Sequence, residues 1–68
     1  MGANETRRAA DLAKRVEALG VRVRRSEAGY VAYPPDPDVP PVVWHRSPSD
    51  HRWMRNTLTR LRRSGIDV

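Results

Sequence analysis

Apolar residues recur with the spacing of an α-helix near both ends of this 68-residue chain, and that pattern limits the folds the chain can adopt. In the first segment they follow an i, i+3, i+4, i+7 pattern, which is typical of a helix with one buried side. These residues are Ala9, Leu12, Ala13, Val16 and Leu19. We expect Asn4 to cap this helix after a flexible lead at residues 1–4, and Gly20 to end it as the residue just past its last turn.

The second helical pattern follows the sequence SPSD at positions 47–50, which has the features of a helix start. Ser47 is placed to cap the helix, Pro48 suits its first position, and Asp50 is favoured by the helix dipole. The side expected to be buried carries Trp53, Met54, Thr57, Leu58 and Leu61. Gly65 should end the helix, with Ile66 folding back on its last turn.

Three short segments of β-forming residues lie between these helices. Residues Val21 to Arg24 alternate valine with arginine, the period-two pattern of a strand with one buried face. Residues 26–29 favour a turn, and Tyr30 to Tyr33 and Val42 to His45 predict two further strands. The proline-rich residues 34–41 should form a stiff loop, because proline has no backbone N–H to donate within a sheet.

These elements predict an α+β fold in the order α-β-β-β-α, folded as a single domain over residues 1–68. A three-stranded antiparallel sheet can bury one face against both helices and leave the other in water. Arg22 and Arg24 would lie on that open face. The residues predicted to form the core are Leu12, Val16, Leu19, Val21, Val23, Met54, Leu58 and Leu61.

The charge balance points to a polyanionic partner, since thirteen Lys and Arg residues face eight Asp and Glu residues, for a net charge of +5. All of the basic residues except Lys14 are arginines, whose planar guanidinium binds phosphate and stacks on bases. A GC-rich genome that encodes arginine wherever the surface carries a cation would give the same composition. The second helix and its lead-in contain Asp50 as their only acid, which favours nucleic acid, RNA more than DNA, over an acidic protein. The predicted RNA-binding residues are Arg22, Arg24, Arg52, Arg55, Arg62 and Arg63.

The aromatic residues and histidines have both structural and functional interpretations. Tyr30, Tyr33 and Trp44 could stack on bases, but in a chain without phenylalanine they are also the largest core residues, and the core role is the commoner one. Period two should place Tyr30 and Tyr33 on different faces of the sheet. His45 and His51 are the only imidazoles; either could transfer a proton, although surface or capping roles are more frequent.

The absence of cysteine removes disulfides and cysteine-based metal sites from consideration. The histidine spacing matches no zinc pattern, so we expect neither a metal nor another cofactor. We find no apolar run of the length that a membrane span or signal peptide needs, and we expect a cytoplasmic protein. The oligomeric state is left open by the sequence.

Three features together resemble the HicA family of toxin domains, over about residues 9 to 67. They are the segment LGVRV at 19–23, a strand that ends in His45, and the closing segment LRRSGI at 61–66. The resemblance implies a double-stranded-RNA-binding-like fold, cleavage of mRNA without a metal, and neutralisation by an antitoxin.

The resemblance also implies where the catalytic residue would lie. In the family the catalytic histidine follows a small turn at the start of strand two, and Tyr30 occupies that place here, after Ala28 and Gly29. Because a phenol is a poor general base at neutral pH, we predict a domain that binds RNA without cutting it. His45 matches a second histidine that is common in the family. Two alternatives are an active mRNA interferase that uses His45 as its base, and a phage or mobile-element adaptor that binds a host protein.

Overall fold

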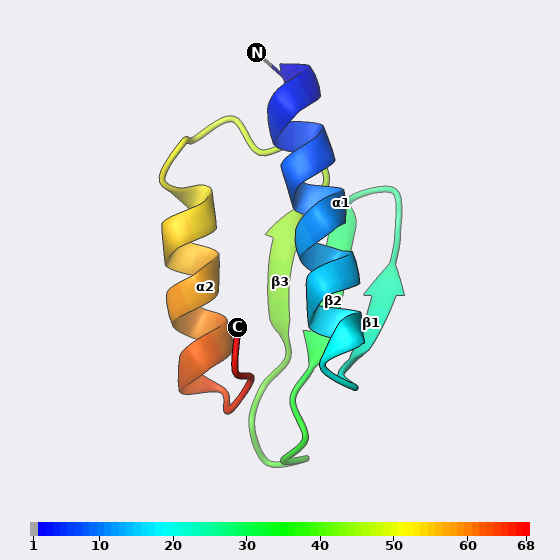
Figure 1. Ribbon diagram of the computed structural model, residues 1–68, viewed down its shortest axis with the longest axis vertical. Coiled ribbons are helices and arrows are strands. Elements are labelled where there is room, and N and C mark those ends of the chain that lie inside the picture. Colours follow the sequence, from blue (N-terminus) through cyan, green and yellow to red (C-terminus); the bar gives the residue numbers. More distant parts are fainter. Residues whose placement is uncertain (1) are drawn as a thin grey trace.

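The computed structural model describes residues 2–68, with side chains from residue 4 onward. It confirms the predicted order α-β-β-β-α (Figure 1). The elements are α1 (Gly2–Ala18), β1 (Arg22–Arg25), β2 (Gly29–Tyr33), β3 (Val42–His45) and α2 (Trp53–Arg63). Residues 34–41 form the predicted loop between β2 and β3. In residues 2–68 we find no helix with the length and apolar character needed to cross a membrane.

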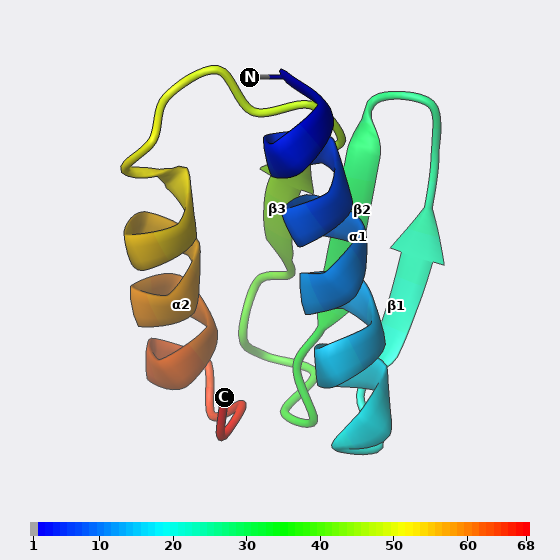
Figure 2. The same ribbon diagram turned by 45° about the horizontal axis from the view of Figure 1, so that its top comes forward.

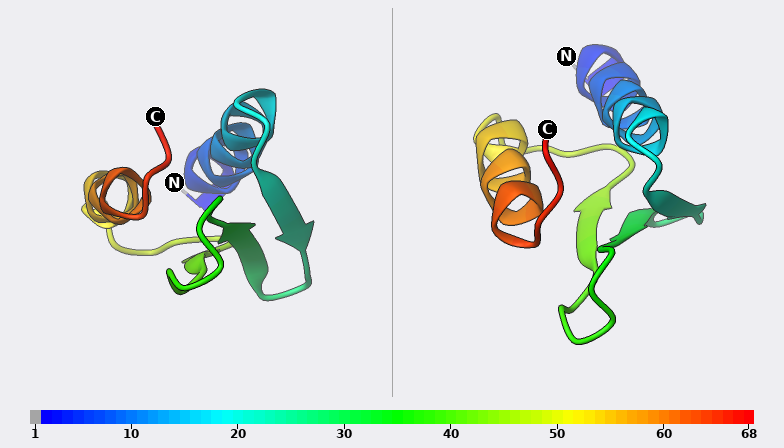
Figure 3. Two further views of the ribbon diagram at one scale, coloured as in Figure 1. Left: turned by 90° about the horizontal axis from the view of Figure 1, so that it is seen from below. Right: turned by 60° about the horizontal axis from the view of Figure 1, so that its bottom comes forward.

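The three strands form one antiparallel sheet in the order β1-β2-β3. Because Val23 pairs with Ala32 and Tyr30 pairs with Trp44, these four residues face the same side, and all are buried. Both helices pack on that side, α1 over β1 and β2, and α2 along β3. The tilted view and the view from below show α2 beside α1 (Figures 2 and 3).

The start of β2 has no room for a side chain, because the backbone conformation of Gly29 directs its Cβ position toward β3. A Cβ atom at Gly29 would overlap the backbone oxygen of Trp44, so this position admits no side chain without moving a strand. Next to it, the backbone N–H of Arg46 donates to the carbonyl of Ala28 over 3.1 Å, which extends the pairing of the two strands past the end of β3.

The core confirms half of the residues predicted for it. Leu12, Val16, Val23 and Leu61 are buried, whereas Val21, Met54 and Leu58 are only partly buried at its border. The prediction for Leu19 is wrong, because this side chain follows the end of α1 and is 48 % exposed. The aromatic rings fill the space instead: Tyr30 stacks on Trp44 with ring centroids 5.6 Å apart, and the Trp44 indole N–H donates to the Ala9 carbonyl over 3.1 Å.

The prediction for the start of α1 is also wrong. The helix begins at Gly2, so Asn4 lies within it rather than at its cap, and residues 2–4 are helical rather than a flexible lead; Met1 lies outside the described residues. Contacts with distant residues explain the longer helix. The Glu5 carboxylate in the first turn accepts a hydrogen bond from the Trp53 indole N–H, which lowers the pKa of Glu5, with Arg8 contributing.

The start of α2 also differs from the prediction, but this helix begins later than expected rather than earlier. The helix begins at Trp53, and Ser47 shares a hydrogen bond with Thr6 over 3.0 Å instead of capping it. Asp50 does act near the helix start, because its carboxylate accepts from the backbone N–H of Arg52 over 2.9 Å. His51 therefore precedes the helix rather than lying in its first turn.

Both helix ends follow the prediction. Gly20 and Gly65 adopt positive φ angles of 85° and 96°, a conformation that is costly for other residues. After α2 the backbone N–H of Gly65 donates to Arg62 and that of Ile66 donates to Leu61, the two hydrogen bonds of a Schellman motif. Ile66 is folded back into the core, where 2 % of its surface is exposed.

Candidate nucleic-acid interface

Carboxylate side chains are absent from all three strands and from α2, and they occur instead in α1 and in the connecting segments. The ion pairs within residues 4–68 are those of Arg8 with Glu5 (3.1 Å) and of Arg25 with Glu17 (2.6 Å). The arginines of α2 and those on the open side of the sheet therefore lack carboxylate partners in this part of the chain. Such unneutralised guanidinium groups are available to phosphates.

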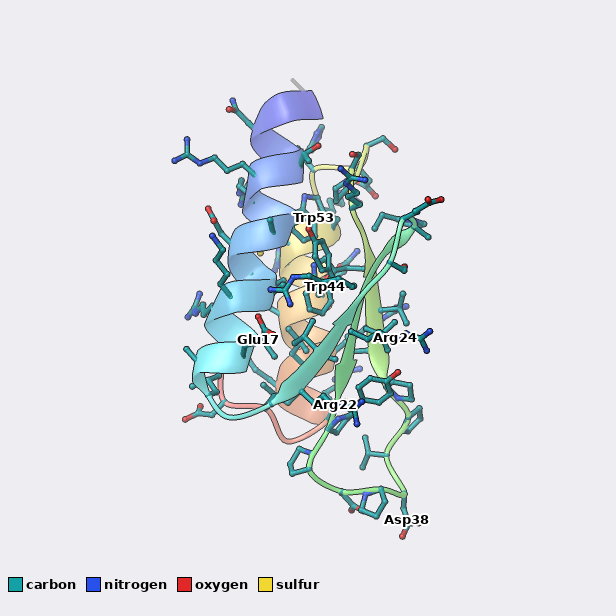
Figure 4. All side chains as sticks on the ribbon, turned by 90° about the vertical axis from the view of Figure 1, so that its right-hand side faces the viewer. Glu17, Arg22, Arg24, Asp38, Trp44 and Trp53 are labelled. Carbon is teal, nitrogen blue, oxygen red and sulfur yellow. The ribbon has the colours of Figure 1, made fainter. Side chains whose placement is uncertain are left out.

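The open face of the sheet presents two of the predicted residues together. Arg22 pairs with Tyr33 and Arg24 pairs with Val31 across β1 and β2, so that all four lie on this side. The Arg22 guanidinium carbon lies 5.9 Å from the centre of the exposed Tyr33 ring. Figure 4 shows both arginines on the side of the sheet away from the helices, whereas Trp44 points toward them.

Arg25, the next residue on β1, shows what the opposite orientation does to an arginine. Two of its nitrogen atoms donate to the Glu17 carboxylate on α1, over 2.6 and 3.0 Å. This interaction raises the pKa of Arg25 and lowers the pKa of Glu17. The Arg25 charge is thus used within the fold, whereas the charges of Arg22 and Arg24 are not.

The basic surface continues from β3 onto α2. Arg60 lines a groove with Val43 and His45, and together with Arg63 it lines a neighbouring groove against Pro40 and Val43. Val43 is 55 % exposed on the open face of the sheet. Arg60 is not among the binding residues predicted from the sequence. The signal was present in the spacing of Arg60 and Arg63, which places them on one stripe of the helix.

The six arginines predicted to bind RNA do not form a single surface. Arg22 and Arg24 lie on the open sheet face, and Arg63 lies on the β3 side of α2. Arg55 and Arg62 lie on a different side of α2, where they line a groove with Arg8 of α1. The sixth, Arg52, is exposed just before α2.

The two candidate catalytic residues also lie apart. Tyr30 is buried on the helix-covered face, stacked on Trp44. His45 pairs with Gly29 and is exposed. Tyr33 is exposed as well, which confirms the expectation that the two tyrosines lie on different faces. The position that the HicA resemblance assigns to catalysis therefore holds a core residue.

No three His, Cys, Asp or Glu side chains are grouped so as to hold a metal ion within the described residues. No family model, curated protein or solved structure matches the chain. The resemblance to HicA stays a prediction.

Proposed function

We propose that this domain binds RNA on the open sheet face and on the adjoining β3 side of α2, and that it leaves the RNA intact. The observation that carries the proposal is the group of arginines without carboxylate partners on a surface whose strands and α2 contain no acids; Asp50, in the segment before α2, lines one groove of it. The residues of this RNA surface are Arg22, Arg24, Tyr33, Val43, His45, Arg60 and Arg63.

The chemistry of this surface suits a single strand. Arginines bind phosphates and release their counterions, which makes affinity fall steeply with salt. The Tyr33 ring and the Arg22 guanidinium provide planar groups on which an unpaired base can stack. Unpaired RNA offers both phosphates and bases to a flat sheet, so RNA fits this surface better than duplex DNA, whose bases are stacked within the helix.

The burial of Tyr30 supports the absence of cleavage, because the position that the HicA resemblance assigns to catalysis lies on the helix-covered face of the sheet. We retain one alternative, a metal-independent mRNA interferase, because of one observation. His45 is exposed and shares a groove with Arg60 and Asp50, so an imidazole and a phosphate-binding group are close to each other.

The proposal is tested by measuring the salt dependence of binding to a labelled single-stranded RNA and to DNA of the same sequence. We expect Arg22→Gln/Arg24→Gln to weaken RNA binding. The steepness with which log K falls with log salt should decrease by about 1.4, at ~0.7 for each phosphate that the variant no longer neutralises. The matched control is Arg7→Gln/Lys14→Gln, which removes the same charge from exposed positions of α1.

Equal effects of the two double variants would contradict the proposal, because binding would then depend on net charge rather than on the sheet. Stronger binding of the DNA would contradict its choice of RNA. Circular dichroism of each variant checks that the fold is retained.

A further inference from the structure

A second groove lies between α1 and α2, on the side of the molecule that the RNA surface does not use. Leu12, Met54 and Leu58 line it, and the last two are only partly buried. Arg8 and Met54 line both halves, so the two halves lie next to each other. The groove combines an apolar floor with basic sides.

The arginines of this groove have matching spacings on the two helices. Arg8 and Arg15 are seven residues apart on α1, and Arg55 and Arg62 are seven residues apart on α2. Seven residues make about two turns, or ~10.5 Å of helix. The helices run in the same direction (Figure 1), so one pair of arginines lies along each side of the apolar floor.

We propose that this groove binds an acidic amphipathic helix of a partner protein. A third helix laid along the groove would place apolar residues on Met54 and Leu58, and carboxylates seven residues apart would match the arginine spacing. The apolar floor favours a protein over a nucleic-acid backbone, because phosphates gain nothing from contact with methionine and leucine. Methionine is also a frequent residue of adaptable binding surfaces.

The charges already in the groove indicate which arginines do most of the binding. Arg8 is paired with Glu5, and Asp11 lines the half of the groove that contains Arg15. Glu5 also acts on His51 in the other half, whereas Arg55 and Arg62 of that half have no Asp or Glu partner within residues 4–68. Partner carboxylates therefore interact mainly with the α2 side.

This inference is independent of RNA binding, since the groove shares no residue with the RNA surface. The experiment uses the full chain labelled with ¹⁵N and a synthetic helical peptide as the probe. The peptide has a leucine stripe flanked by glutamates seven residues apart, and its control has glutamine in place of each glutamate. We expect the acidic peptide to shift the backbone signals of residues 8–15 and 54–62, and to leave those of β1–β3 in place.

Variants make the test specific. Arg55→Gln/Arg62→Gln should weaken peptide binding about tenfold or more, and Arg55→Gln alone should weaken it by less; neither position is buried. The single variant also keeps the hydrogen bond from the Arg62 side chain to the Val68 carbonyl. Arg22→Gln/Arg24→Gln should leave peptide affinity unchanged.

Three outcomes would overturn the proposal. The first is the absence of saturable shifts with the acidic peptide. The second is equal binding of the glutamine peptide, which would mean that the arginines have no role. The third is a titration in which RNA, and not the peptide, shifts the groove residues, which would make the groove a nucleic-acid surface.

Discussion

The two faces of the sheet contain the same residue types, arginine and tyrosine, in different surroundings. On the helix-covered face Arg25 is paired with Glu17, and Tyr30 is stacked on Trp44. On the open face Arg22 and Tyr33 contact each other at the surface, and no carboxylate lies among the strands. The difference shows that strand alternation alone places an arginine or a tyrosine against the helices or on the open face.

The largest expected effect is on stability and comes from Gly29, because both faces of the sheet depend on the pairing of β2 with β3 at this position. Gly29→Ala should lower the free energy of unfolding by roughly 3 to 5 kcal/mol, because its Cβ would collide with the Trp44 backbone oxygen. Urea denaturation measures the change. The control is Gly20→Ala, which has a strained φ but no atom within 4 Å, and which should cost only about 1 to 2 kcal/mol. Equal destabilisation by the two variants would show that the contact with β3 is not the cause.

The tyrosines give the sharpest comparison between the faces. Tyr30→His should destabilise the domain by about 2 to 3 kcal/mol, since it removes a stacked ring and buries a polar one. It should not create RNA cleavage, because position 30 faces the helices. Tyr33→Leu should change stability by no more than about 0.5 kcal/mol and weaken RNA binding about tenfold. Thermal unfolding and fluorescence anisotropy measure both properties, and a reversal of these effects would contradict the assignment of faces.

A smaller effect is expected from pH. The pKa values of Glu5 and Glu17 are lowered in the folded state, by the Trp53 indole and the Arg25 guanidinium respectively. A lowered pKa means that the stabilisation is present above the ordinary glutamate value near 4.5 and is lost as the pH falls through the folded-state value. The urea concentration at the unfolding midpoint should therefore decrease as the pH is lowered below about 4.5. The decrease should be less steep in Glu17→Gln. An unchanged slope in that variant would mean that the pair with Arg25 does not contribute.

The smallest expected effect is that of His45→Ala on RNA integrity. The wild-type domain should leave a labelled RNA intact, and the variant should behave in the same way. Gel electrophoresis after prolonged incubation measures this. If the wild type cuts RNA and folded His45→Ala does not, the interferase alternative replaces the proposed function.

The sequence predicts much of this fold because the decisive signals are local. Period-two and helical patterns, together with the glycines at 20 and 65, are read from neighbouring residues alone. The helix starts were mispredicted because distant partners decide them: Trp53 holds the first turn of α1, and Thr6 takes the hydroxyl that Ser47 would offer as a cap.

The candidate site was less predictable for the same reason. Sequence reasoning found the arginines but grouped those of α2 as one face, whereas β3 and α1 approach different sides of that helix. The spacing of Arg60 and Arg63 places them on one stripe of α2, but the contact of that stripe with β3 depends on Val43 and His45, which are distant in sequence. The orientation of Arg22 and Arg24 was predicted, since it follows from alternation alone.

The position of β1 at the edge of the sheet has a further consequence. Within residues 2–68 the strand beside it is β2 alone, so its other side has no strand pairing in this part of the chain, and such an edge allows sheets to join and aggregate. Three of its four residues are arginines. Two copies that met along this edge would bring like charges together across the new pairing, which is unfavourable. The arginines proposed to hold RNA therefore also oppose extension of the sheet into a second molecule.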